Sequence, residues 1–244
     1  DLQSKSRVYE LITGNGFAVE GYPARALFSI PFVGLNEEGL PTFINEDGNV
    51  TISDIYFQEN EKIDYLKYEG STDPTVTGSF GNEFKYKNWH LNVYLTYSFG
   101  SVVRLYPSFF VNYNDLSATP KEFKNRWVVP GDEKITNIPT IASLRQLQNV
   151  TNLSYAYNAY NYSTERIAKG DFIRLKELSL SYDLPKSWIG KAGIKTASLK
   201  LQALNLFLLY ADKKLNGQDP EFMNSGGVAT PMPKQFTFTL RVGM

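Results

Sequence analysis

The side chains best suited to contact a ligand are aromatic and gather in one polar part of the sequence. Tyr and Trp rings combine a large rigid surface with a polar group, which suits stacking on sugar rings or contact with a partner protein. Packing of the segment against itself competes with both uses. The candidates for ligand or partner contact are Trp127, Tyr155, Tyr157, Tyr160 and Tyr162.

Few residues are available for catalysis or metal binding. The chain has one His and no Cys, so a Ser-His-Asp triad would have to use His90, and a thiolate site or a two-His metal motif is excluded. His90 lies between Asn88 and Asn92, where a hydrogen-bonded surface role is the simpler interpretation. Asp47, Asn49 and Asp54 lack the spacing of a calcium loop. We therefore expect no enzymatic activity, no cofactor and no metal.

Charge and hydropathy narrow the class of protein further. The 244 residues include 25 Lys and Arg against 25 Asp and Glu, so the net charge is zero and a nucleic-acid partner is not expected. The longest apolar run, around 204–211, is far shorter than the roughly 20 residues of a membrane-spanning helix. A spanning β-strand needs only about 9–11 residues of alternating pattern, so a membrane location stays open.

Alternation of apolar and polar residues predicts an all-β fold. In the last segment Phe236, Phe238 and Leu240 fall on one face and Thr237 and Thr239 on the other. A change of parity near Lys176 and Glu177 predicts a β-bulge. The five predicted long strands cover 88–99, 103–113, 172–184, 198–208 and 234–244.

The connections between these strands alternate in length. A tight turn at 100–102 and a short connector at 185–196 contrast with long segments at 114–171 and 210–233. Short turns at one end and long loops at the other are typical of an outer-membrane barrel, with the long loops extracellular. A soluble β-sandwich would also alternate, but its strands are usually nearer five or six residues.

The polar positions of these strands are expected to face the interior of such a barrel. On this basis the candidate lumen-facing residues are His90, Asn92, Arg104 and Arg241. Residues 1–86 contain no long alternating segment, but Asp47-Gly48 predicts a small hairpin between 41–44 and 50–52. We interpret 1–86 as an extracellular loop region and 87–244 as the five strands with their loops.

Several ordered motifs resemble the SusC/RagA-like TonB-dependent outer-membrane transporters. The stretch 170–185, GDFIRLKELSLSYDLP, is similar to that family's GDFLRLKNLTLGYTLP element. The family's NLF, DPE and P-x-P-x-x-F-T elements follow this stretch at 205–207, 219–221 and 231–237. Its EGYP, GN-x-x-x-YKN and RW-x-x-PGD elements precede the stretch at 20–23, 81–88 and 126–132, and all six stand in the same order as in the family.

The resemblance implies the C-terminal part of a 22-stranded antiparallel transmembrane barrel whose remaining strands and N-terminal plug lie outside this sequence. It further implies a Gram-negative outer-membrane importer, embedded in lipid and energised by TonB, that takes up oligosaccharides or peptides with a SusD-like surface lipoprotein. The family's last strand usually ends in Phe, whereas this sequence ends in Met244. The alternative that the residues leave open is a soluble extracellular all-β module that binds carbohydrate or protein.

Overall fold

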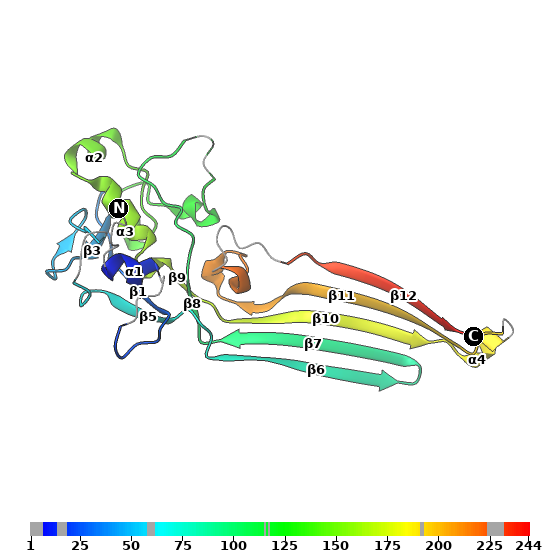
Figure 1. Ribbon diagram of the computed structural model, residues 1–244. Helices are drawn as coiled ribbons and strands as arrows, with labels where there is room; N and C mark the ends of the chain where they lie inside the picture. The colour runs from blue at the N-terminus through cyan, green and yellow to red at the C-terminus, as the bar shows by residue number, and fades with distance from the viewer. Residues whose placement is uncertain are drawn as a thin grey trace, which may run out of the picture.

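The protein consists of a long single-layer β-sheet with a cluster of shorter elements at one end (Figure 1). We refer to the described residues within 7–75 and 100–171 as the loop cluster. The computed structural model describes residues 7–13, 19–57, 62–114, 116, 118–190, 193–223 and 232–244. Parts of the predicted loops 1–86, 114–171 and 210–233 therefore lie outside the described residues.

The sheet contains five antiparallel strands in the order β12-β11-β10-β7-β6. The strands are β6 (Val76–Tyr86), β7 (Trp89–Phe99), β10 (Phe172–Asp183), β11 (Thr196–Ala211) and β12 (Gln235–Gly243). Four of them match predicted strands closely. The register shifts between Leu175 and Glu177 against both neighbouring strands, which confirms the predicted bulge.

The strand register places apolar side chains of all five strands on one face. Leu180 lies opposite Leu91 and Leu201, and Phe84 and Phe238 extend the same row to the two edges. Exposed fractions in this row reach 58% for Leu201 and 63% for Phe238. Because monomeric proteins in water rarely expose an apolar surface of this extent, the face requires a nonaqueous or protein neighbour.

The opposite face of the sheet is polar along the same strands. His90 lies opposite Ser181, which in turn lies opposite Lys200, and the next row contains Asn92 and Gln202. At the end of the sheet away from the loop cluster, the apolar face carries aromatic rings, among them Trp89 and Tyr182 with centroids 4.5 Å apart. A polar face, an apolar face and an aromatic border are features of a transmembrane barrel wall.

Strand β6 was not predicted, because two glycines interrupt its alternation. Gly78 lies opposite Tyr97 and Gly81 opposite Tyr94. A Cβ atom at Gly78 would lie 2.4 Å from the Tyr97 hydroxyl, so the cross-strand ring fills the space above the glycine. The boundary predicted at residue 86 therefore moves to residue 75, and residues 87–88 form the tight turn between β6 and β7.

The long strand predicted at 103–113 is wrong. Only β8 (Val102–Arg104) forms there, and it pairs with β9 (Ile167–Lys169) outside the main sheet. Pro107 has no N–H to donate to a ladder, and the amides of Ser108 and Phe109 donate to the Asn161 side chain instead. The alternation in this segment reflects burial of every second side chain inside the loop cluster. The predicted tight turn at 100–102 is accordingly where the chain leaves the sheet.

The loop cluster is built from short elements around a main apolar core, and a smaller apolar cluster lies at β8 and β9. Its strands are β1 (Ala26–Ser29), β2 (Phe32–Leu35), β3 (Pro41–Ile44), β4 (Val50–Thr51) and β5 (Lys67–Ser71), besides β8 and β9. Its helices are α1 (Arg7–Thr13), η1 (Lys121–Asn125), η2 (Asp132–Lys134), α2 (Leu144–Asn149), α3 (Leu153–Asn161) and η3 (Thr164–Arg166). The predicted hairpin around Asp47-Gly48 is confirmed by the pairing of β3 with β4.

Long and short connections do alternate between the two ends of the sheet. The turn 87–88 and the connector with α4 (Lys186–Ile189) lie at the end away from the loop cluster, as does the C-terminus (Figure 1). At the other end, β11 and β12 are joined through η5 (Lys213–Leu215) and η6 (Pro220–Phe222). Within the described part of the chain, the helices are too short or too polar to span a lipid bilayer.

Candidate functional site

The junction between the loop cluster and the polar face of the sheet is organised by residues 212–222, which we call the clamp loop. Arg174 of β10 reaches this loop from the polar face, and its Nη2 lies 2.6 Å from both carboxylate oxygens of Asp219. Both side chains are almost fully buried, and Glu221 adds a second carboxylate at 3.2 Å. The Asp219 side chain also accepts from the Glu221 amide, which begins η6.

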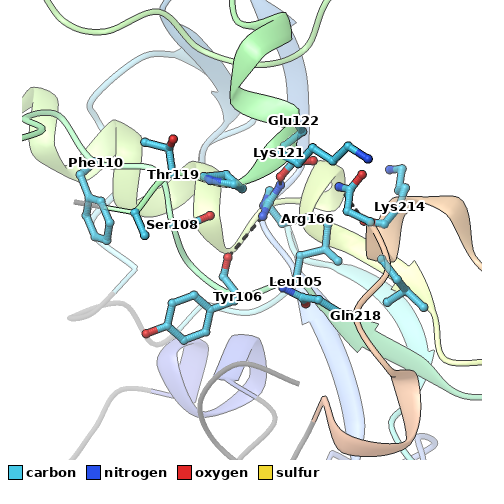
Figure 2. Close-up of a pocket in the computed structure, with 14 residues that line it drawn as sticks. Leu105, Tyr106, Ser108, Phe110, Thr119, Lys121, Glu122, Arg166, Lys214 and Gln218 are labelled. Carbon is cyan, nitrogen blue, oxygen red and sulfur yellow. Dashed lines mark hydrogen bonds and ion pairs between the residues drawn. The ribbon is translucent and has the colours of Figure 1, made fainter. Parts of the chain in front are cut away.

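A pocket of about 290 Å³ lies between η1, the segment 105–110 that follows β8, and the clamp loop, and we call it the basic pocket (Figure 2). Its charged lining residues are Lys121, Glu122, Arg166 and Lys214, so positive charges exceed negative ones by two. Leu105 and Leu215 supply apolar wall, and Gln218 supplies an amide. This lining suits an anionic group joined to a small apolar body.

Arg166 is held on the wall of the basic pocket by several contacts. Its guanidinium forms an ion pair with Glu122, donates to the Tyr106 carbonyl at 3.2 Å and lies 4.8 Å from the centre of the Phe109 ring. Its side chain is 4% exposed. Arg166 and Glu122 were not predicted from the sequence, because they lie 44 positions apart and no local motif connects them.

A second pocket, of about 720 Å³, lies between the polar face and the base of the loop cluster, and we call it the hydroxyl pocket. Its charged residues balance: Arg25 pairs with Asp73 at 2.9 Å, and Lys176 lies in the same lining as Glu221. Much of the remaining lining consists of hydroxyl side chains from Thr72, Thr77, Ser79, Thr96, Ser98 and Ser101. Such a neutral, hydroxyl-rich surface can exchange hydrogen bonds with sugar hydroxyls or peptide amides.

Two of the predicted aromatic contact residues belong to the core. Tyr157 and Tyr160 lie on the buried face of α3, spaced as a helix requires, and burial raises the pKa of both phenols. The Tyr157 hydroxyl donates to the Thr140 carbonyl at 2.5 Å. The helical spacing of Leu153, Ala156, Tyr157 and Tyr160 is the sequence signal for α3 that the interpretation as an aromatic loop overlooked.

The other three predicted aromatic residues occupy different surroundings. Trp127 packs against Gly39 so closely that its ring leaves no room for a Cβ atom there, and its indole N–H donates to Glu133 at 3.1 Å. Tyr155 and Tyr162 are partly exposed and, with Asn158, line a third pocket of about 660 Å³. Ligand contact therefore stays a prediction for Tyr155 and Tyr162, whose rings line a cavity.

The structure places three of the four predicted lumen residues on the polar face. His90 Nε2 lies 3.1 Å from Asp183 and its Nδ1 3.5 Å from Glu83, while the Asn92 amide donates to Glu177 at 3.4 Å. Arg241 of β12 lies opposite Ser198 of β11. No group of three or more His, Asp or Glu side chains in the described part of the chain has the arrangement of a metal site.

The placement of Arg104 on the barrel wall is wrong. Arg104 is in β8, and its guanidinium donates to the carbonyls of Phe28 at 2.6 Å and Ile12 at 3.1 Å, and to the Ser29 hydroxyl. Burial lowers the pKa of Arg104 to about 9, which keeps the side chain charged at neutral pH. Its role is to join β8 to α1 and β1, because these carbonyls would otherwise be buried without a donor.

Sequence comparison relates the chain to bacterial receptors. It is 28% identical over 188 residues to TonB-dependent receptor P3 of Formosa agariphila, covering 77% of this chain and 16% of the relative. It is 26% identical over 190 residues to TonB-dependent receptor P39 of the same organism, covering 73% and 17%. The chain thus spans about a sixth of the curated relatives it matches. No protein-family model matches the chain.

Comparison with solved structures shows a shared fold. The RagAB peptide importer in its open-open state aligns with a TM-score of 0.63 at 23% identity, over 92% of this chain and 23% of that one. The closed-closed state aligns with a TM-score of 0.61 at 22% identity. The predicted resemblance to the SusC/RagA-like TonB-dependent transporters and the predicted all-β fold class are confirmed. The described strands share the fold of part of that barrel and do not close into a barrel among themselves.

Proposed function

We propose that this chain forms part of the wall of an importer in the Gram-negative outer membrane. The observation that carries the proposal is the five-strand sheet, with one exposed apolar face and one polar face in register. Lipid acyl chains match the apolar face, and the polar face would line the lumen. The chain has a transport role and catalyses no reaction in this proposal.

The proposed partners follow from what the sheet lacks. Among the described strands, β12 pairs only with β11 and β6 only with β7, so each edge leaves a row of backbone N–H and C=O groups unpaired. In hydrocarbon each unpaired group costs several kcal/mol. We infer that the remaining strands of the barrel cover both edges and that a plug occupies the lumen. TonB acts through those other parts, and a SusD-like lipoprotein covers the extracellular side of the loop cluster.

We propose peptides or oligosaccharides as the cargo. The hydroxyl pocket opens toward the polar face and offers neutral hydrogen-bonding groups that either cargo could use. RagAB, whose fold this chain shares, is a peptide importer, which favours peptides for this chain. Uptake by cells that depend on the full transporter tests the proposal: labelled peptide should enter, and collapse of the proton motive force should stop entry. Entry that persists without the force would contradict TonB-coupled import.

The second candidate function is a soluble extracellular binding module built on the Tyr155 and Tyr162 pocket. The partly exposed rings in that pocket favour it, but the apolar face of the sheet does not. A soluble module would purify as a monomer without detergent, whereas the importer requires detergent or lipid throughout. Purification of the full protein from the membrane fraction therefore separates the two candidates.

We predict opposite accessibility for the two ends of the sheet. A cysteine replacing Ser154, in the loop cluster, should react with a membrane-impermeant maleimide on intact cells. A cysteine replacing Ser187, in the connector between β10 and β11, should react only after the outer membrane is permeabilised. The chain has no native cysteine to confuse the readout, and both positions are exposed. Labelling of position 187 alone on intact cells would invert the proposed orientation.

We also predict that β12 pairs with a strand outside residues 1–244. A photo-crosslinking residue at Leu240, on the apolar face of the edge strand, should attach to a peptide from another part of the transporter. The matched control is Leu180, which lies between Leu91 and Leu201 and should crosslink within this chain. If mass spectrometry finds only internal crosslinks from position 240, the barrel does not close at β12.

A further inference from the structure

Two solvent-accessible lysines bring positive charge into the basic pocket. Glu122 is engaged by Arg166, so this pair contributes little net charge to the lining. Lys121, on η1, is exposed and has no ion pair within the described residues. Lys214, on η5, is 45% exposed, and its ammonium group contacts Glu165 through the carboxylate at 3.4 Å and the backbone carbonyl at 3.3 Å. The lining therefore keeps two ammonium groups that an incoming anion can reach.

The two lysines come from different walls of the same pocket. Lys121 follows Pro120 at the start of η1, whereas Lys214 belongs to the clamp loop that the Arg174–Asp219 pair attaches to the sheet. Figure 2 shows Lys121 close to Glu122 and Lys214 on the far side of Arg166 from Phe110, with the Tyr106 carbonyl bonded to Arg166. Because the Glu122–Arg166 and Arg174–Asp219 pairs anchor these two elements, the backbone positions of both lysines are set before any ligand binds.

The rest of the lining selects the body that carries the anion. Much of the pocket wall is apolar: the half-exposed Phe110 offers the largest apolar surface, and the almost fully buried Leu105 and Leu215 complete the lining. A volume of about 290 Å³ is at the lower limit of small-molecule sites and has room for about one amino-acid residue. A sugar acid presents hydroxyls around its whole ring, and this apolar wall would leave several of them unpaired.

From these features we propose that the basic pocket binds the free C-terminal carboxylate of a peptide, together with its last side chain. Lys121 and Lys214 pair with the carboxylate, and Leu105, Leu215 and Phe110 contact the side chain. Arg166 is a positioning residue, which holds Glu122 away from the carboxylate and maintains the wall. The proposal rests on the proposed import function and specifies one end of the cargo.

Binding to the complete transporter in detergent tests this assignment. The probes are short mixed-sequence peptides labelled at the N-terminus, prepared with either a free C-terminal carboxylate or a C-terminal amide. The wild-type protein should bind the free acid about tenfold more tightly than the amide, because a charge-assisted pair is lost in the amide. The preference should weaken as salt is raised, since both lysines are reached by solvent.

Two sets of lysine variants test whether the preference for the free acid arises in the basic pocket. The double variant Lys121→Gln and Lys214→Gln should bind acid and amide equally. Lys134→Gln, an exposed lysine on η2 outside the lining, should retain the wild-type preference. Equal binding of acid and amide by the wild type, or an unchanged preference in the double variant, would overturn the proposal.

The same measurements separate this proposal from the proposed function. If peptides are bound and imported but the acid and amide are equivalent, import stands and the carboxylate site fails. If an oligouronate binds this pocket in preference to the peptide acid, with loss in the double variant, the peptide assignment is overturned. If neither peptides nor oligosaccharides are bound or imported, both proposals fail.

Discussion

Replacing Leu201 with Arg is expected to destabilise the full barrel by about 2–4 kcal/mol if the residue lies near the bilayer midplane. Leu201 is on the apolar face of β11, opposite Leu180 and Phe238, and is 58% exposed within this chain. A guanidinium at this position would have to enter hydrocarbon or displace the strand. The measurement is a urea titration of the transporter folded into lipid vesicles.

The control is the adjacent residue on the opposite face. Gln202 lies opposite Ser179 and Thr237 on the polar face. Gln202→Arg places the same charge one residue away in a polar environment, so we expect a change within about 1 kcal/mol. Equal losses for the two variants would show that the two faces of the sheet are not divided between lipid and lumen.

Loss of the buried pair between the sheet and the clamp loop is expected to have the second large effect. Arg174→Met leaves the fully buried Asp219 carboxylate without its cation, and removal of one partner from such a pair typically costs about 3–5 kcal/mol. The Arg174–Asp219 pair is what joins β10 to the clamp loop. We therefore expect faster hydrogen exchange and new protease cleavage across residues 212–222, with a smaller change in the strands.

The control for Arg174→Met is a more exposed ion pair on the polar face of the sheet. Lys200 lies 3.8 Å from Glu177, and both side chains are partly exposed. Lys200→Met should cost no more than about 1 kcal/mol, because solvent compensates both charges. If Arg174→Met also leaves the clamp loop protected, the packing of the loop rather than the ion pair holds it in place. Loss of the acid preference in Arg174→Met would further connect the clamp loop to the basic pocket.

The sequence alone predicts the strands whose two faces each meet one kind of surroundings along their whole length. Residues 88–99, 172–184 and 234–244 alternate because one face meets a polar environment and the other an apolar one along their whole length. The parity change at Lys176 and Glu177 similarly predicted the bulge, since the side-chain period of a strand is two. The turn chemistry of Asp47-Gly48 identified the hairpin, because this dipeptide adopts the required backbone conformation without help from distant residues.

Tertiary structure decided the features that depend on distant residues. Strand β6 exists because Tyr94 and Tyr97 of β7 cover its glycines, and 103–113 is not a long strand because Asn161 takes two of its backbone amides. The basic pocket likewise joins η1, the segment 105–110, η3 and the clamp loop, which lie up to about a hundred residues apart. Periodicity shows which side of a segment is apolar, but not what covers that side. The same alternation therefore occurs in a strand of the sheet and in a segment packed into the loop cluster, and only the tertiary structure tells them apart.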